Sequence, residues 1–227
     1  MILLGVDVET TGLNHLSDEV TEVGAVLWCT EKSTPLRLFS KFVQAKVPIS
    51  EEITQLTGIT QEMVDKYGEP ADDVAEELKD FAKDSEALVA HNAVFDINFL
   101  NGMGFVYDRP VIDTRVDIKY PGFVTTRKLT HLAADHGFAN PFAHRALFDV
   151  LTMLRVLEKY DFYEVLARSK EPLVRASAQV SFAKKDLAKA RGYSWDADNK
   201  TWFKEMKKSD AELEAKEAPF NVSFMEV

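Results

Sequence analysis

The chain has 227 residues, of which 46% are hydrophobic, enough for one sizeable α/β domain with an appendage. No apolar run approaches the ~18 residues that a membrane span needs, and the single cysteine, Cys29, excludes an internal disulfide and a cysteine-based zinc site. The formal net charge of −10 argues against a nucleic-acid partner, but the charge is unevenly spread: residues 165–208 hold eleven Lys and Arg and five acids.

The first predicted element is a buried strand over residues 2–8. This apolar run meets Asp7 and has no basic leader or small-residue cleavage site, so it is typical of a core strand and not of a signal peptide. We therefore expect an intracellular, cytoplasmic protein with no membrane partner. Residues 20–29 and 36–43 predict two more strands, and the short connections favour an antiparallel meander.

The hydrophobic period changes after Pro48. Ser50 and Thr60 are candidate N-caps of two short helices, and Pro70 opens a longer helix with apolar residues at i, i+4 and i+7. Further along the chain we expect a strand at 87–91, a helix at 94–103, a strand at Val111 and Ile112, and helices near 126–136 and 144–160. Strands first, and then strands alternating with helices, predict an α/β fold with a mixed sheet flanked by helices.

The sequence that follows this predicted fold differs in composition, because it is short and basic. We expect one main domain over residues 1–165 and a small basic C-terminal appendage over 166–227, with a helix at 183–191, a hairpin around Trp195 and Trp202, and loose order over 207–227. Three interpretations stay open. The tryptophans form a minimal core of their own, they stack on a single strand, or they dock a partner protein.

Four acids and one histidine carry the candidate chemistry. Asp7 and Glu9 lie two apart on a strand, so their carboxylates point to one face. Asp96 falls early in a helix, and His144 precedes the helix that holds Asp149. Each has an ordinary explanation when taken alone: a strand running into solvent, a helix N-terminal acid favoured by the dipole, or a helix-terminal histidine.

Taken together, these residues match metal-dependent phosphodiester hydrolysis. Two divalent ions need several shared carboxylates, and Mg²⁺ prefers hard oxygen ligands. An imidazole exchanges its proton near neutral pH and can accept the proton of an attacking water. The acidic excess outside residues 165–208 is in part what such a site requires.

Three segments resemble the exonuclease motifs of the DEDDh family. They are residues 7–13 (Asp-Val-Glu-Thr-Thr-Gly-Leu), 92–96 (Asn-Ala-Val-Phe-Asp) and 144–149 (His-Arg-Ala-Leu-Phe-Asp), in the order of that family. The resemblance implies a ribonuclease-H-like fold and 3′→5′ hydrolysis to 5′-mononucleotides with two Mg²⁺ or Mn²⁺ ions. It implies Asp7, Glu9, Asp96 and Asp149 as metal ligands and His144 as the general base.

The same resemblance implies a set of substrate contacts. Thr10, Gly12 and Leu13 would hold the terminal nucleotide, with Leu13 wedged against a base, and Asn92 would orient the site. Residues 56–60 (Leu-Thr-Gly-Ile-Thr) resemble a segment that contacts the terminal nucleotide in relatives, although Thr57 stands where many relatives have histidine. Ile59 is a candidate contact there, with a core role as the alternative.

The resemblance leaves the substrate and the biological setting open. The leading hypothesis is an exonuclease acting on the 3′ end of single-stranded DNA, with DNA favoured over RNA. The alternatives are an exoribonuclease that trims RNA or short oligoribonucleotides, and a proofreading subunit bound to a separate polymerase through the appendage. An inactive binding module is disfavoured because all five catalytic positions hold the right residue types.

Overall fold

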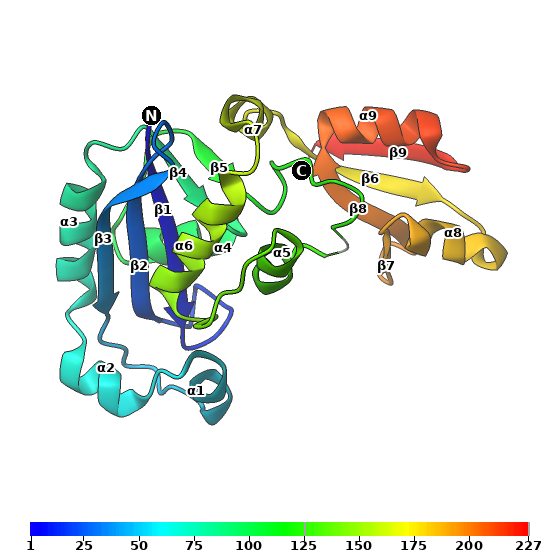
Figure 1. Ribbon diagram of the computed structural model, residues 1–227. Helices are drawn as coiled ribbons and strands as arrows, with labels where there is room; N and C mark the ends of the chain where they lie inside the picture. Colours follow the sequence, from blue (N-terminus) through cyan, green and yellow to red (C-terminus); the bar gives the residue numbers. More distant parts are fainter. Residues whose placement is uncertain (125, 227) are drawn as a thin grey trace. The chain divides into compact units, whose positions relative to one another are not determined.

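The computed structural model describes residues 1–124 and 126–226 (Figure 1). The chain divides into two compact units, Met1–Leu166 and Ala167–Val227. Among the described residues, no helix combines the length and the apolar character that crossing a membrane would need.

The first unit is built on a five-stranded mixed sheet. Its strands are β1 (Ile2–Thr10), β2 (Val20–Cys29), β3 (Thr34–Phe42), β4 (Ala87–Ala90) and β5 (Val111–Asp113), in the spatial order β3-β2-β1-β4-β5. β2 pairs antiparallel with β1 and β3, whereas β4 pairs parallel with β1 and β5. β1 is therefore the central strand, and the predicted mixed sheet is confirmed.

The described residues of the first unit form seven helices. The last of them continues across the division between the two units. The helices are α1 (Glu51–Thr57), α2 (Gln61–Tyr67), α3 (Ala71–Ala82), α4 (Ala93–Gly102), α5 (Leu129–Asp135), α6 (Ala146–Leu157) and α7 (Phe162–Ser169). The side chains of Ser50 and Thr60 accept hydrogen bonds from Ile53 N and Met63 N, each at 3.2 Å, so both predicted caps are confirmed. The predicted 126–136 and 144–160 helices are shorter than expected at both ends.

Helices cover the two faces of the sheet. One apolar cluster joins Leu4, Val6 and Val8 of β1 to α3 and α4, and the other joins Leu3 to α6. Figure 1 shows α6 lying over β1 and β2. The approach is close because Gly24 lies under it: a Cβ there would stand 2.3 Å from the backbone nitrogen of Leu147.

The second unit is a small antiparallel sheet with helices. Its strands are β6 (Leu173–Gln179), β7 (Ser194–Asp196), β8 (Thr201–Lys207) and β9 (Asn221–Glu226), in the order β7-β8-β6-β9. The helices are a 3₁₀ turn η1 (Phe182–Lys184), α8 (Lys185–Ala190) and α9 (Lys208–Glu217). They share one small core with the sheet, formed by Val174, Ala176, Ala178, Ala188, Tyr193, Trp202, Met206 and Ala211.

The expectation of loose order at the C-terminal end is wrong. Residues 208–217 form α9 and residues 221–226 form β9, which pairs along the length of β6. Val227 lies outside the described residues. The predicted helix and hairpin are confirmed as η1–α8 and β7–β8, while β6 and α7 were not anticipated.

Candidate active site

The carboxyl end of β1 presents two of the predicted acids. Asp7 and Glu9 are partly buried and alternate with the buried Val8. Asp96 comes from the first turn of α4 and is 2% exposed. Its Oδ1 accepts a hydrogen bond of 3.1 Å from the backbone N–H of Val8, which ties the helix to the strand at the level of the two acids.

The remaining two predicted residues lie at the start of α6. The backbone N–H of His144 donates to Asp149 Oδ2 at 3.2 Å, and the Asn140 amide donates to Asp149 Oδ1. His144 has a φ of 63°, in the left-handed region, so the chain turns sharply before the helix begins. One ligand atom each from Glu9, His144 and Asp149 lies within 4.8 Å of the others.

Burial and like charge raise the pKa of the acids. Burial raises the pKa of Asp7 well above its ordinary range, and the neighbouring carboxylates of Asp96, Glu9 and Asp149 raise it further. Burial, followed by the charge of Asp149, raises the pKa of Glu9 to about 8. Burial also raises the pKa of Asp96 and of Asp149. Such a cluster favours a bound cation, which would compensate the charges.

A buried ion pair beside the cluster was not predicted. Glu22 of β2 lies opposite Glu9 in the strand register and is 2% exposed. Its carboxylate accepts two hydrogen bonds from the Arg145 guanidinium, at 2.8 and 3.1 Å, and one from the Ala146 N–H at 3.0 Å. The pair anchors the first turn of α6 to β2, so it fixes where His144 and Asp149 stand.

A second unpredicted acid supports the motif at residues 92–96. Asp113, at the end of β5, accepts hydrogen bonds from the N–H groups of Asn92 and Ala93 at 3.0 and 3.1 Å. The side-chain oxygen of Asn92 accepts from Arg115 at 3.0 Å. Asn92 has a φ of 85° and caps α4, which explains why a residue that tolerates the left-handed region stands there.

The residues predicted to contact the substrate differ in how far they are exposed. Leu13 is 85% exposed in the loop after β1, a position open to a base. Thr10 is buried, and its hydroxyl donates to the Gly12 carbonyl. Gly12 has a packing reason of its own, since a Cβ would stand 2.5 Å from the Asp18 carboxylate. Ile59 is fully buried, so the structure corrects its predicted substrate contact to the alternative core role.

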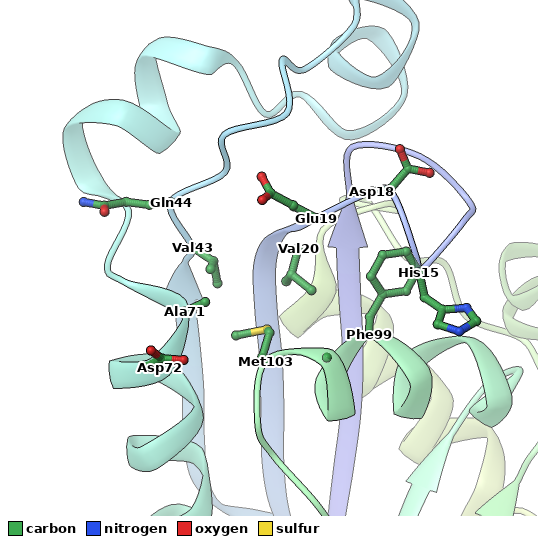
Figure 2. Close-up of a pocket in the computed structure, with 11 residues that line it drawn as sticks. His15, Asp18, Glu19, Val20, Val43, Gln44, Ala71, Asp72, Phe99 and Met103 are labelled. Atoms are coloured by element: carbon green, nitrogen blue, oxygen red, sulfur yellow. The ribbon is translucent and has the colours of Figure 1, made fainter.

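A separate pocket of about 180 Å³ lies beside the loop that follows β1 (Figure 2). Its lining combines apolar side chains, such as those of Val20, Phe99 and Met103, with polar ones, Glu19 among them. The Glu19 carboxylate accepts from the backbone N–H groups of Lys46 and Val47, so it holds a neighbouring segment. None of the four carboxylates lines this pocket, which is therefore distinct from the acidic cluster.

The mixed sheet and its flanking helices have the ribonuclease-H-like fold. Residues 4–157 match the exonuclease family model (RNase_T), and the chain belongs to this family. The resemblance to the DEDDh exonucleases is thereby confirmed, and membership implies a need for divalent metal ions. Residues 174–225 match a domain of unknown function (DUF8626).

Two bacterial proteins illustrate the sequence relatives. The PolC-type DNA polymerase III of Clostridium perfringens is 36% identical over 162 residues, which cover 69% of this chain and 11% of the polymerase. The corresponding polymerase of Streptococcus pneumoniae strain R6 is 35% identical over 158 residues, covering 66% of this chain and 10% of the polymerase. The chain thus matches about a tenth of the length of these relatives.

Solved structures of nucleases share the fold. The nuclease domain of 3′hExo, a DEDDh family member bound to rAMP, has a TM-score of 0.58 at 22% identity, covering 70% of this chain and 90% of that domain. Escherichia coli exonuclease I in complex with a dA16 oligonucleotide has a TM-score of 0.62 at 15% identity, covering 77% of this chain and 48% of that one.

Proposed function

We propose that this protein is a 3′→5′ exonuclease that hydrolyses single-stranded DNA from its 3′ end and releases 5′-mononucleotides. The observation that carries the proposal is the convergence of Glu9, His144 and Asp149 within 4.8 Å, with Asp7 and Asp96 beside them. The donor set is four carboxylates whose pKa values are raised by burial, and hard divalent cations suit such a set.

Asp7, Glu9, Asp96 and Asp149 would hold two Mg²⁺ or Mn²⁺ ions. When bound, these ions would stabilise the negative charge that develops on the phosphate. The His144 imidazole is exposed beside Glu9 and Asp149, where it can accept the proton of the attacking water. The hydrogen bond from Val8 and the Glu22–Arg145 pair hold the carboxylates in place before substrate arrives.

Two observations support the choice of substrate. The chain is 36% identical to part of a PolC-type DNA polymerase III, and the fold is shared with a nuclease solved with a DNA oligonucleotide. The first observation also supports a second candidate, a proofreading role beside a polymerase carried on another chain. RNA is the alternative substrate, because 3′hExo, which has the same fold, was solved with rAMP.

The test uses the purified protein with Mg²⁺ and, separately, Mn²⁺ on matched single-stranded DNA and RNA oligonucleotides labelled at the 5′ end. We expect a ladder that shortens from the 3′ end on DNA. Asp7→Ala should abolish it, whereas Asp108→Ala, which removes a 90% exposed acid outside the cluster, should leave it unchanged. A ladder on RNA alone would make RNA the substrate in place of DNA. No ladder on either oligonucleotide would overturn the proposal.

A further inference from the structure

A row of rings and lysines runs along one side of the second unit. It consists of Phe182 of η1, Lys185 and Lys189 of α8, Trp202 of β8 and Trp195 of β7. We call it the aromatic–lysine row. The Lys185 ammonium lies 4.1 Å from the centre of the Phe182 ring, and the Lys189 ammonium lies 5.9 Å from the Trp202 ring. The two tryptophan rings stand 5.4 Å apart at 57°.

The row is contiguous because four elements, η1, α8, β7 and β8, meet there. Lys185 and Lys189 are four apart on α8 and therefore share a face of the helix. Trp195 and Trp202 are directly opposite in the β7–β8 register. Figure 1 shows α8 beside the β7–β8 hairpin, and the buried Ala188 packs α8 into the small core with Trp202.

The row is only partly explained by folding. Trp202 is 8% exposed and belongs to the core, as the self-contained interpretation of the tryptophans requires. Phe182, however, is 82% exposed and Trp195 is 50% exposed. Folding therefore accounts for Trp202 and leaves the rings of Phe182 and Trp195 in solvent.

The charge around the row is mixed, with Asp186 directly after Lys185 on α8. Within residues 167–226, the ion pairs of the structure join neither Lys185 nor Lys189 to an acid. Asp196 of β7 pairs with Arg175, and Glu214 of α9 pairs with Arg191. Four of the acids of the unit lie on α9: Asp210, Glu212, Glu214 and Glu217.

We propose that the aromatic–lysine row binds single-stranded nucleic acid. Exposed rings stack on unpaired bases without regard to sequence, and ammonium groups between them neutralise the phosphates that link those bases. The inference extends the proposed exonuclease function, on which its biological sense rests. A strand held by the row is bound to the same chain that carries the acidic cluster. This raises the effective concentration of the strand's 3′ end at the cluster.

The first experiment measures binding without hydrolysis. Fluorescence anisotropy with a labelled dT20 strand and the full chain in EDTA compares the wild type with Lys185→Glu/Lys189→Glu. The matched control is Lys32→Glu/Lys216→Glu, which makes the same charge change at two exposed lysines outside the row. We expect the row variant to bind about tenfold or more weakly, and the slope of log K against log salt to shrink by about 1.4.

The second variant tests stacking. Trp195→Ala should weaken dT20 binding about tenfold, and Trp195→Phe should restore most of the affinity. Thermal unfolding of each variant checks that the second unit still folds. With metal present, the control variant Lys32→Glu/Lys216→Glu should hydrolyse dT20 at the wild-type rate, because it changes neither the row nor the acidic cluster.

Unchanged dT20 affinity in the folded lysine variant and in Trp195→Ala would overturn the inference and leave a protein partner as the occupant of the row. A wild type that binds dT20 through the row but hydrolyses no oligonucleotide would instead overturn the proposed function.

Discussion

Glu9 is largely buried and lies among other acidic side chains. Its pKa is about 8 in the folded protein against an ordinary value of 4.5, because burial and the charge of Asp149 oppose its ionisation. Below pH 4.5 the group is protonated in both states. Between pH 4.5 and 8 the unfolded chain loses this proton and the folded chain keeps it, so stability falls as the pH rises.

Through Glu9 the metal-free protein should therefore lose stability over this range, by an amount on the order of 5 kcal/mol, and this contribution should level off above pH 8. Denaturant titrations in EDTA from pH 4.5 to 9 measure it. Glu9→Gln should reduce the fall, since a neutral side chain has no proton to lose, while the raised pKa values of Asp7, Asp96 and Asp149 keep part of it in place. Equal pH profiles for Glu9→Gln and wild type would remove Glu9 as the cause.

Glu22 offers a different kind of test, because it acts through Arg145 and not on the substrate. Glu22→Gln keeps the shape but weakens the charge-assisted bonds to Arg145, so we expect a loss of stability of about 1–3 kcal/mol. His144 and Asp149 would then be less well positioned, and kcat should fall about tenfold or more while KM changes little.

Steady-state kinetics and thermal unfolding of Glu22→Gln would be read against Glu31→Gln, an 82% exposed acid near the end of the same strand. A positioning role requires that Glu22→Asp, which retains the charge, recovers part of kcat. A fall in stability with kcat unchanged would reduce the pair to a purely structural role.

The five residues predicted to be catalytic could be singled out because they lie in three short motifs. The structure brings Glu9, His144 and Asp149 within reach of one another, and the roles of all five stay a prediction. Glu22 could not be singled out, since one acid within an apolar strand has no local pattern and only the β1–β2 register places it opposite Glu9. Asn140 and Asp113 were missed for the same reason: each reaches a motif residue by a fold-dependent hydrogen bond. Ile59 shows the reverse error, a motif residue that the fold buries.

The seating of α6 on β2 depends on the absence of a side chain at Gly24. A methyl group there would collide with the backbone of Ala146 and Leu147, between His144 and Asp149. Gly24→Ala should therefore push the start of α6 outward and lower kcat at least tenfold, with a stability loss of about 1–3 kcal/mol.

Gly102→Ala is the matched control, because a Cβ at Gly102 meets nothing within 4 Å. Activity assays and circular dichroism on both variants would separate local displacement from general unfolding. A Gly24→Ala protein with wild-type kcat would show that α6 adjusts without moving the site.

Elements with a clear hydrophobic period were predictable from the sequence, and α3 is an example: its periodic residues Val74, Leu78 and Phe81 are all buried. The C-terminal elements lacked that pattern. α9 buries only Ala211, so it has no apolar stripe, and its helical state depends on packing against the small sheet. β9 alternates weakly, and its strand state follows from pairing with β6.

The whole chain contains separate cores, because the apolar clusters of the first unit share no member with that of the second. We expect calorimetry to resolve more than one unfolding transition. Mn²⁺ should raise only the transition of the unit that carries the acidic cluster, by about 2.7 kcal/mol at a hundredfold excess over Kd.

The Asp7→Ala variant supplies the control for that experiment, since the loss of a ligand should abolish the metal-dependent shift while the other transition stays in place. A shift of every transition by Mn²⁺ would mean that metal binding reaches beyond the first unit.

The acidic cluster combines the first strand of the chain with the sixth helix. Synthesis on the ribosome proceeds from the N-terminus, so Asp7 and Glu9 emerge long before His144 and Asp149. A nascent chain cannot assemble the cluster until nearly the entire first unit has left the exit tunnel. The proposed exonuclease would thus be inactive during its own translation, and a product truncated before α6 would lack two of the residues of the cluster, His144 and Asp149.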